Sequence, residues 1–247
     1  GQAAFTTALA FLTMEQKVTG PILMGSAVYF QNKDLLIKQF GKQAIEVNEM
    51  DVDAVEKAIA THRPRAVFFD TLGNVEGVLM PDANRIVELV KKYATEDTFV
   101  VLDTTCLPFQ RLPLTNTLTK HPKVHLIVIE SLNKYYQFGM DRTTAGVVWG
   151  IGKNMEKLFG YRKNLGTLIL DASVHMLPTP NRKMLKKRMD RLERNANLLA
   201  TQLREIPPAG EAGNFATTKK KVESIIYPGR GSFLTVRFTP KYRKISF

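Results

Sequence analysis

The chain has 247 residues, 44% of them hydrophobic, which is enough for one large or two modest globular domains and excludes a disordered chain. The single cysteine, Cys106, excludes an internal disulfide and favours a reducing, cytoplasmic setting, and four scattered histidines give no metal-ligand spacing. The net charge of +12 is concentrated in residues 182–194 and 219–221 without interleaved aromatic residues, so solvated surfaces explain it better than nucleic-acid binding does.

The first two thirds of the chain alternate between helical and strand patterns. Small and apolar residues at 2–13 and a second pattern at 34–40 predict helices, and Asp51 and Asp82 are placed to cap two more. The predicted strands cover residues 22–24, 66–69, 99–102 and 126–129, followed by a second buried run at 145–149. Continuous apolar strands separated by amphipathic helices indicate a mostly parallel sheet with helices on both faces.

The pattern changes in the last third. Apolar residues recur every three or four positions from 182 to 206 and predict one long amphipathic helix. The alternating stretch SFLTVRF, at residues 232–238, predicts a strand. We therefore expect a large domain over residues 1–170, and a long connecting helix with a smaller α+β domain over residues 171–247. No apolar run reaches the roughly 20 residues that a membrane-spanning helix needs.

Polar residues follow three of the predicted strands at their carboxyl ends. These residues are Asp70, Thr71 and Asn74 after the first, Asp103 and Thr105 after the second, and Ser131, Asn133 and Lys134 after the third. Ligands of open α/β sheets bind outside the carboxyl ends of the strands, so these side chains should meet at one rim. A carboxylate, small hydroxyls and a lysine suit a cofactor with a pyridine nitrogen, a phosphate and an aldehyde, namely pyridoxal phosphate (PLP).

Lys134 lies between two apolar runs, where an ammonium group is expensive to desolvate. Desolvation lowers the pKa of an amine and makes it nucleophilic near neutral pH, which suits a Schiff base with an aldehyde. Ordinary alternatives are a solvated loop lysine for Lys134, a turn former for Asp103, turn hydroxyls for Thr105 and Ser131, and a core side chain for Tyr29. We interpret Cys106 as a small buried residue and not as a nucleophile.

Several segments match the motifs of one enzyme family in order along the chain. GQAA resembles S-G-M-A-A, SAVYFQNKDLLIKQF is similar to D-x-x-Y-G-G-T-x-R-L-F, and FFDTLGNVEGVL is similar to E-T-P-x-N-P. VVLDTTCLPFQ resembles V-V-D-N-T-F-x-x-P, and ESLNKYYQFGMDRTTAGVVWG resembles S-x-T-K-Y with a following G-G-x-V run. The chain therefore resembles the Cys/Met-metabolism family of fold-type-I PLP enzymes, which includes cystathionine γ-synthase and methionine γ-lyase.

The resemblance implies the fold of the fold-type-I PLP transferases. This is an α/β fold with a mostly parallel, seven-stranded type of sheet flanked by helices, and with a smaller C-terminal α+β domain. Residues 1–170 would form the PLP-binding domain. The resemblance also implies that a phosphate-binding segment of the neighbouring subunit's site precedes Gly1, and that the arginine for the substrate carboxylate follows the last residue, so both domains are expected to be incomplete in this sequence.

The resemblance also implies roles around the ring of the cofactor. Lys134 would form the Schiff base and later move the Cα proton of the substrate. Asp103 would keep the ring nitrogen protonated, and Thr105 would lie beside Asp103. Asn74 would lie near the ring hydroxyl. Tyr29 would stack on the ring and assist proton transfer at the leaving group.

At the other end of the cofactor, the resemblance implies a phosphate site. Ser131, Asn133 and the backbone of Gly1 and Gln2 at a helix start would bind the phosphate, as helix N-termini do. Asn133 stands where the family motif has threonine, and Phe30 and Gln31 replace a pair of glycines after Tyr29. These bulkier residues near the ring predict a reshaped substrate pocket.

We expect a PLP-dependent lyase or transferase that performs elimination or replacement at Cβ or Cγ of a sulfur- or oxygen-substituted amino acid. The unusual residues near the ring also fit a specialised biosynthetic variant with an activated γ-leaving group such as S-adenosylmethionine. An aminotransferase on the same fold is one alternative, and a non-catalytic basic binding protein is another. The resemblance implies a homodimer or homotetramer with shared active sites. We expect a cytoplasmic protein with no metal, membrane or nucleic-acid partner.

Overall fold

The computed structural model describes residues 1–73, 75–108, 121–205 and 222–240. The chain divides into two units, of which the larger is drawn from Gly1–Asn74 and Leu79–Pro180 and the smaller from Val75–Val78 and Asn181–Phe247. Among the described residues, no helix combines the length and apolar character needed to cross a membrane.

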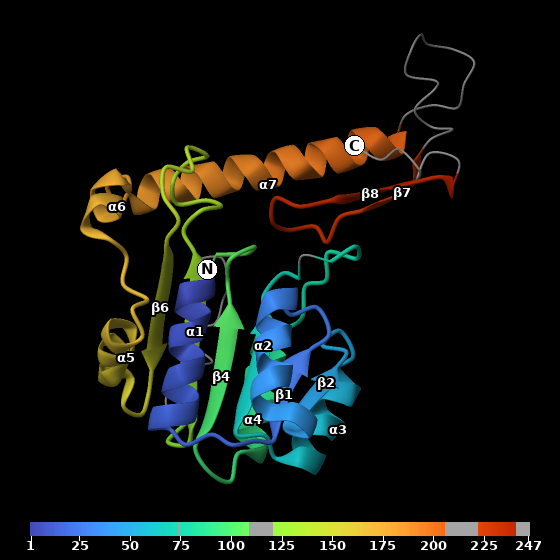
Figure 1. Cartoon of the computed structure of the whole chain (residues 1–247). Helices are drawn as coiled ribbons and strands as arrows, with labels where there is room; N and C mark the ends of the chain where they lie inside the picture. Colours follow the sequence, from blue (N-terminus) through green and yellow to red (C-terminus); the bar gives the residue numbers. More distant parts are fainter. Residues whose placement is uncertain (74, 109–120, 206–221, 241–247) are drawn as a thin grey trace, which may run out of the picture. The chain divides into compact units, whose positions relative to one another are not determined.

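A six-stranded sheet forms the centre of the larger unit (Figure 1). Its strands are β1 (Ile22–Gly25), β2 (Ala44–Val47), β3 (Ala66–Asp70), β4 (Thr98–Asp103), β5 (Val124–Ser131) and β6 (Gly146–Ile151). They lie in the order β2-β1-β3-β4-β5-β6, and every neighbouring pair is parallel except β5 and β6. The predicted mostly parallel α/β sheet is confirmed, with six strands from the described residues in place of the seven-stranded type.

Helices cover both faces of this sheet. Their bounds are α1 (Gln2–Ala10) with a π-helical continuation (Phe11–Glu15), α2 (Phe30–Phe40), α3 (Val52–His62), α4 (Ala83–Tyr93) and α5 (Leu158–Asn164), with short 3-10 helices at Gly41–Gln43 and Met155–Lys157. The next helix, α6 (Asp171–Met176), buries none of its side chains. One core cluster joins α1, α2 and α5 to the sheet, and a second joins α3 and α4 to the opposite face. Each inner strand therefore contributes side chains to both clusters, which is why its sequence is a continuous apolar run.

Two of these helices begin at capping residues that the sequence predicted. The side chain of Asp51 accepts a hydrogen bond from the backbone N–H of Ala54, and the side chain of Asp82 accepts one from Arg85, each at 3.0 Å. A side-chain cap satisfies an N–H group that has no partner within the helix. The caps thus fix the starting points of α3 and α4.

An ion-pair cluster lies at the amino ends of β4 and β5, away from the rim where the candidate residues gather. Asp97 Oδ1 lies 2.9 Å from Nε2 of the buried His125, and Asp97 Oδ2 lies 2.5 Å from Lys153 Nζ. Asp97 immediately precedes β4, and His125 is the second residue of β5. This cluster joins the strand starts and uses no residue of the predicted site.

The smaller unit contains α7 (Arg182–Glu205) and an antiparallel pair, β7 (Val222–Ile226) and β8 (Thr235–Phe238). The long helix predicted at 182–206 is therefore confirmed. The hydroxyl of Tyr227 donates to the backbone oxygen of Glu193 at 3.3 Å, and the N–H of Gly231 donates to the Glu193 side chain at 3.1 Å. These two bonds fasten the strand pair to α7.

Candidate active site

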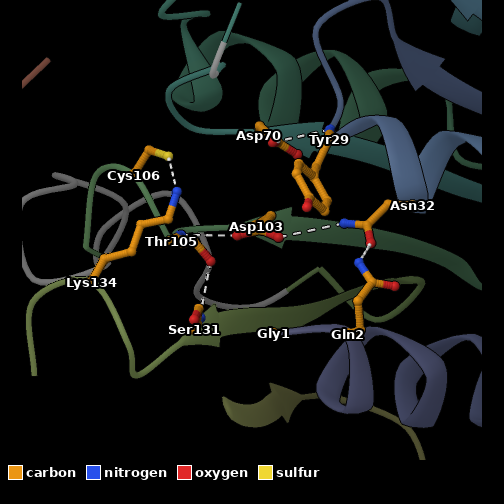
Figure 2. A pocket seen from close by; sticks show the side chains of 10 residues that line it. All are labelled: Gly1, Gln2, Tyr29, Asn32, Asp70, Asp103, Thr105, Cys106, Ser131 and Lys134. Carbon is orange, nitrogen blue, oxygen red and sulfur yellow. Dashed lines mark hydrogen bonds between the residues drawn. The ribbon is translucent and has the colours of Figure 1, made fainter. Parts of the chain in front are cut away.

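A cavity of about 160 Å³ lies at the carboxyl ends of β3, β4 and β5, beside the N-termini of α1 and α2 (Figure 2). It is lined by Gly1, Gln2, Tyr29, Asn32, Asp70, Asp103, Thr105, Cys106, Ser131 and Lys134. Most of the predicted cofactor-binding residues are in this set. Asn133 is not in the set, and the predicted residue Asn74 lies outside the described residues.

Asp103 is the last residue of β4 and lies at the centre of the cavity wall (Figure 2). Its Oδ1 accepts the backbone N–H of Thr105 at 2.9 Å, and its Oδ2 accepts the side-chain amide of Asn32 at 3.5 Å. The hydroxyl of Thr105 in turn accepts the backbone N–H of Ser131 at 2.9 Å. N–H donors stabilise the charged form of a carboxylate, so Asp103 is suited to hold a protonated pyridine nitrogen.

Asp70 is the residue beside Asp103 on the neighbouring strand, because the parallel register pairs the two positions. Burial, and next the Asp103 carboxylate, hold the pKa of Asp70 well above its usual range. The backbone N–H of Tyr29 donates to the Asp70 carboxyl group at 3.2 Å. The two carboxyl groups therefore differ: burial favours the neutral form of Asp70, whereas each oxygen of Asp103 accepts a hydrogen bond from an N–H donor.

Tyr29 is the N-cap residue of α2, and its ring projects into the cavity (Figure 2). The preceding loop is held by the buried side chain of Glu49, which accepts the backbone N–H of Ser26 at 2.7 Å and that of Ala27 at 2.8 Å. A Cβ at Gly25 would lie only 2.6 Å from Glu49 Oε1, so this approach requires glycine. The hydrogen bonds to Glu49 thus fix the backbone of the loop that leads to Tyr29.

Lys134 lies three residues beyond the end of β5, and its Nζ donates to Cys106 Sγ at 3.5 Å. We expected Lys134 to be desolvated between two buried strands, and this expectation is wrong because Lys134 is exposed. The reason is that β5 ends at Ser131 and that β6, an edge strand, is only partly buried. The lysine therefore reaches the cavity from its open side.

Cys106 lies in the cavity wall next to Lys134 Nζ. Burial raises the pKa of the Cys106 thiol to about 11, so the thiol stays protonated at neutral pH. Its side chain is almost fully buried, as expected for a small packing residue. In the motif V-V-D-N-T-F-x-x-P this position is the phenylalanine, so the thiol leaves more room beside Lys134 than an aromatic ring would.

The start of α1 forms the far end of the cavity. Gly1 is the N-cap of this nine-residue helix, and a Cβ built on Gly1 would lie 3.9 Å from Ser131 Oγ. The first turn of a helix presents N–H groups without acceptors inside the helix, and these bind anions. Gly1, Gln2 and Ser131 together therefore form a suitable phosphate site.

The side chain of Asn133 makes a hydrogen bond within the protein. Its Oδ1 accepts the backbone N–H of Ala145 at 3.0 Å, while its own N–H donates to Ser131 Oγ at 3.3 Å. The side chain thus ties the turn after β5 to the segment before β6. Its contact with a phosphate group stays a prediction.

Three lining residues had no assigned role in our predicted site: Asn32, Asp70 and Cys106. Asp70 was grouped with the strand-end residues, and its place beside Asp103 follows from the parallel pairing. Asn32 was missed because one asparagine in an amphipathic helix carries no signal. The motif offered a clue, since Asn32 stands at the threonine of Y-G-G-T.

The donor set of the cavity fits PLP. A lysine, a carboxylate supported by N–H donors, an aromatic ring, and a helix start with a nearby hydroxyl lie on one cavity, in the arrangement that an aldehyde, a pyridine nitrogen, a flat ring and a phosphate need. Among the residues that the structure describes, no group of three or more His, Cys, Asp or Glu side chains is placed to hold a metal ion.

The fold and this site define a PLP-dependent enzyme of fold type I. The crystal structure of metB from Corynebacterium glutamicum has the same fold, with a TM-score of 0.67 and 20% identity, over 96% of this chain and 60% of that one. The model of the Cys/Met metabolism PLP-dependent enzymes matches residues 1–243, and the chain therefore belongs to that family.

Two curated relatives show how much of a family member the chain represents. The bifunctional enzyme flvA of Aspergillus flavus is 24% identical over 200 residues, which are 81% of this chain and 24% of flvA. Cystathionine gamma-synthase of Haemophilus influenzae is 26% identical over 194 residues, which are 78% of this chain and 46% of that enzyme. The chain thus spans less than half the length of either relative.

Proposed function

We propose that the chain carries the PLP site of an enzyme that performs elimination or replacement at Cβ or Cγ of a sulfur- or oxygen-substituted amino acid. The observation that supports this most directly is the presence of Lys134 and Asp103 on one cavity with a helix start at its far end. When bound, PLP supplies an electron sink for the negative charge that develops at Cα of the amino acid.

The residues of the chain would divide the remaining work. Lys134 would attach the cofactor through Nζ and, once the amine of the substrate replaces it there, would carry the Cα proton. Asp103 would hold the ring nitrogen and its proton, while Tyr29 would lie over the ring and deliver a proton to the leaving group. Gly1, Gln2 and Ser131 would bind the phosphate.

For the substrate we propose an amino acid with an activated γ-leaving group, such as S-adenosylmethionine. Phe30 is 64% exposed, and the centre of its ring lies 4.8 Å from that of Tyr29. Tyr29 lines the cavity, and an exposed ring next to it would suit a flat base or a sulfonium cation, which is attracted to ring faces. The glycine pair of the family motif would offer neither contact.

We also propose that the protein is a cytoplasmic homo-oligomer. The stretch around α6 exposes large apolar side chains, including Leu170 at 74% and Val174 at 46%. A contiguous exposed apolar stretch marks a surface that another protein covers. The assignment to the cytoplasm is supported by the single, unpaired cysteine.

The test of the site uses PLP and borohydride. Wild-type protein incubated with PLP should develop a visible absorption band, and reduction should attach one cofactor to Lys134, as read by peptide mass spectrometry. Lys134→Ala should lose both signals, whereas Lys153→Ala, at the other end of the sheet, should keep them. Cofactor attached to the Lys134→Ala protein would contradict the assignment.

The reaction is tested by adding amino acids with β- or γ-leaving groups, S-adenosylmethionine among them, to the reconstituted protein. Release of the leaving group together with ammonia, or with a new substituted amino acid, is the expected result. Formation of a keto acid with one equivalent of aminated cofactor would identify an aminotransferase. A colourless protein that traps no cofactor would leave only a binding role.

A further inference from the structure

Two amide side chains connect Asp103 to the starts of two helices. Gln2, the first residue of α1, donates from Nε2 to Asn32 Oδ1 at 2.7 Å. Asn32, in the first turn of α2, donates from Nδ2 to Asp103 Oδ2 at 3.5 Å. Figure 2 shows the three side chains connected in sequence at the cavity, with Asn32 between Asp103 and Gln2.

The direction of this chain of hydrogen bonds is set by Asp103. An ionised carboxylate only accepts, so Asn32 must turn its NH₂ group toward Asp103. The carbonyl of Asn32 then faces Gln2, which must donate. The backbone N–H of Thr105 supplies the donor for the other oxygen of Asp103. Each amide has one orientation that satisfies the chain, and a protonated Asp103 would not impose it.

Burial makes this orientation costly to lose. Asn32 is 2% exposed, and a buried amide that loses its partners pays the desolvation cost of its polar atoms. The bond from Gln2 therefore keeps Asn32 in the rotamer that meets Asp103.

This pair is a property of the present chain. In the motifs S-G-M-A-A and Y-G-G-T, the positions of Gln2 and Asn32 hold methionine and threonine. A methionine side chain has no N–H to donate at the position of Gln2. A threonine side chain at the position of Asn32 is too short to bond to Gln2 and Asp103 at once. We propose that Gln2 and Asn32 are positioning residues that keep the Asp103 carboxylate directed at the ring nitrogen of PLP, an inference that rests on the proposed function of the cavity.

The test compares variants that remove only the hydrogen bonds. Asn32→Leu keeps the branched shape of the side chain, and Gln2→Met keeps its length and the backbone N–H of α1. Gln39→Met removes an exposed amide from the same helix and serves as the matched control. The readouts are the dissociation constant for PLP and the pH midpoint of the visible band of the reconstituted protein.

Asn32→Leu should raise the PLP dissociation constant about tenfold, as expected for the loss of a hydrogen bond to a charged group, and should shift the pH midpoint. Gln2→Met should move both readouts in the same direction by about threefold or less, and Gln39→Met should move neither. Because Asn32 acts through Asp103, Asn32→Leu should add nothing in an Asp103→Asn background. If Asn32→Leu does not fold, as judged by circular dichroism, the Gln2→Met comparison decides.

The outcomes separate the two proposals. A wild-type protein that binds no PLP overturns the proposed function and this inference together. A wild-type protein that binds PLP, with Asp103→Asn altering the band while Gln2→Met and folded Asn32→Leu match wild type, overturns the inference alone. An effect of Asn32→Leu that is equally large in the Asp103→Asn background also overturns it, since Asn32 would then act independently of Asp103.

Discussion

At the scale of single residues, the buried carboxyl groups of the larger unit differ in their hydrogen-bond partners. Asp70 and Asp103 end neighbouring strands and face one cavity, yet only Asp103 receives N–H donors on both oxygens. Glu49 is as buried as either, and it is held by donors from the loop after β1. Carboxyl side chains therefore serve as proposed ring partner (Asp103), neighbour of that partner (Asp70) and loop anchor (Glu49) within a single fold.

Glu130, on β5, gives a pH-dependent prediction. Its side chain is buried, Tyr136 OH donates to Oε2 at 2.8 Å, and burial raises the pKa of Glu130 to about 7. The folded protein then binds a proton that the unfolded chain releases near pH 4.5, so stability falls as pH rises between these values. Glu130→Gln removes the titration, and it should therefore exceed wild type in unfolding free energy above pH 7 by up to about 3 kcal/mol.

The measurement is urea unfolding of both proteins at pH 5 and pH 8. The difference in unfolding free energy should grow in favour of Glu130→Gln at the higher pH. Glu156→Gln, an exposed change in the same unit, should track wild type at both pH values. A difference between Glu130→Gln and wild type that is independent of pH would show that Glu130 is ionised in the folded protein throughout.

Candidate residues at strand ends were predictable because a parallel sheet brings its carboxyl ends to one edge. Asp103, Thr105, Ser131 and Lys134 follow from that rule and from the motifs. Asn32 was missed, since its contacts reach residues 30 and 71 positions away in the chain and only its place in the Y-G-G-T motif pointed to it. The exposure of Lys134 was also mispredicted, because the apolar residues of a strand do not show whether other side chains bury the turn that follows it.

At the scale of elements, the length and burial of each helix or strand decided whether it could be predicted from the sequence. The fully buried strands β1, β3, β4 and most of β5 carry apolar runs and were predicted. The edge strand β2 has four residues of mixed burial and no apolar run, so it was missed. The short helices α5 and α6 were missed as well, since six or seven largely exposed residues show no helical periodicity.

The cap of α4 yields a prediction about one element. Asp82→Ala removes the acceptor for the N–H of Arg85 and should lower the unfolding free energy by about 1 kcal/mol. Asp82→Ser retains a capping oxygen and should recover most of the loss. Urea unfolding at neutral pH measures both, and equal stability of the alanine and serine variants would show that the cap contributes little.

At the scale of the whole molecule, the exposed stretch around α6 bears on assembly. Leu170→Lys combined with Val174→Lys places charge where an apolar partner surface would pack, and should raise the dissociation constant of the oligomer about tenfold or more. Sedimentation velocity over a range of protein concentrations measures this. Ile37→Lys, an exposed apolar position on α2, is the control, and an unchanged mass distribution for the double variant would exclude α6 from the interface.

The ion-pair cluster of Asp97, His125 and Lys153 has a practical consequence. It secures the amino ends of the strands, while the cavity occupies their carboxyl ends, so the two ends of the sheet can be altered separately. Cys106 is the sole cysteine of the sequence and is buried. A cysteine introduced at the exposed Glu156 would thus be the accessible thiol for a fluorophore or a surface linker, leaving the pocket free to be followed optically in an immobilised sample.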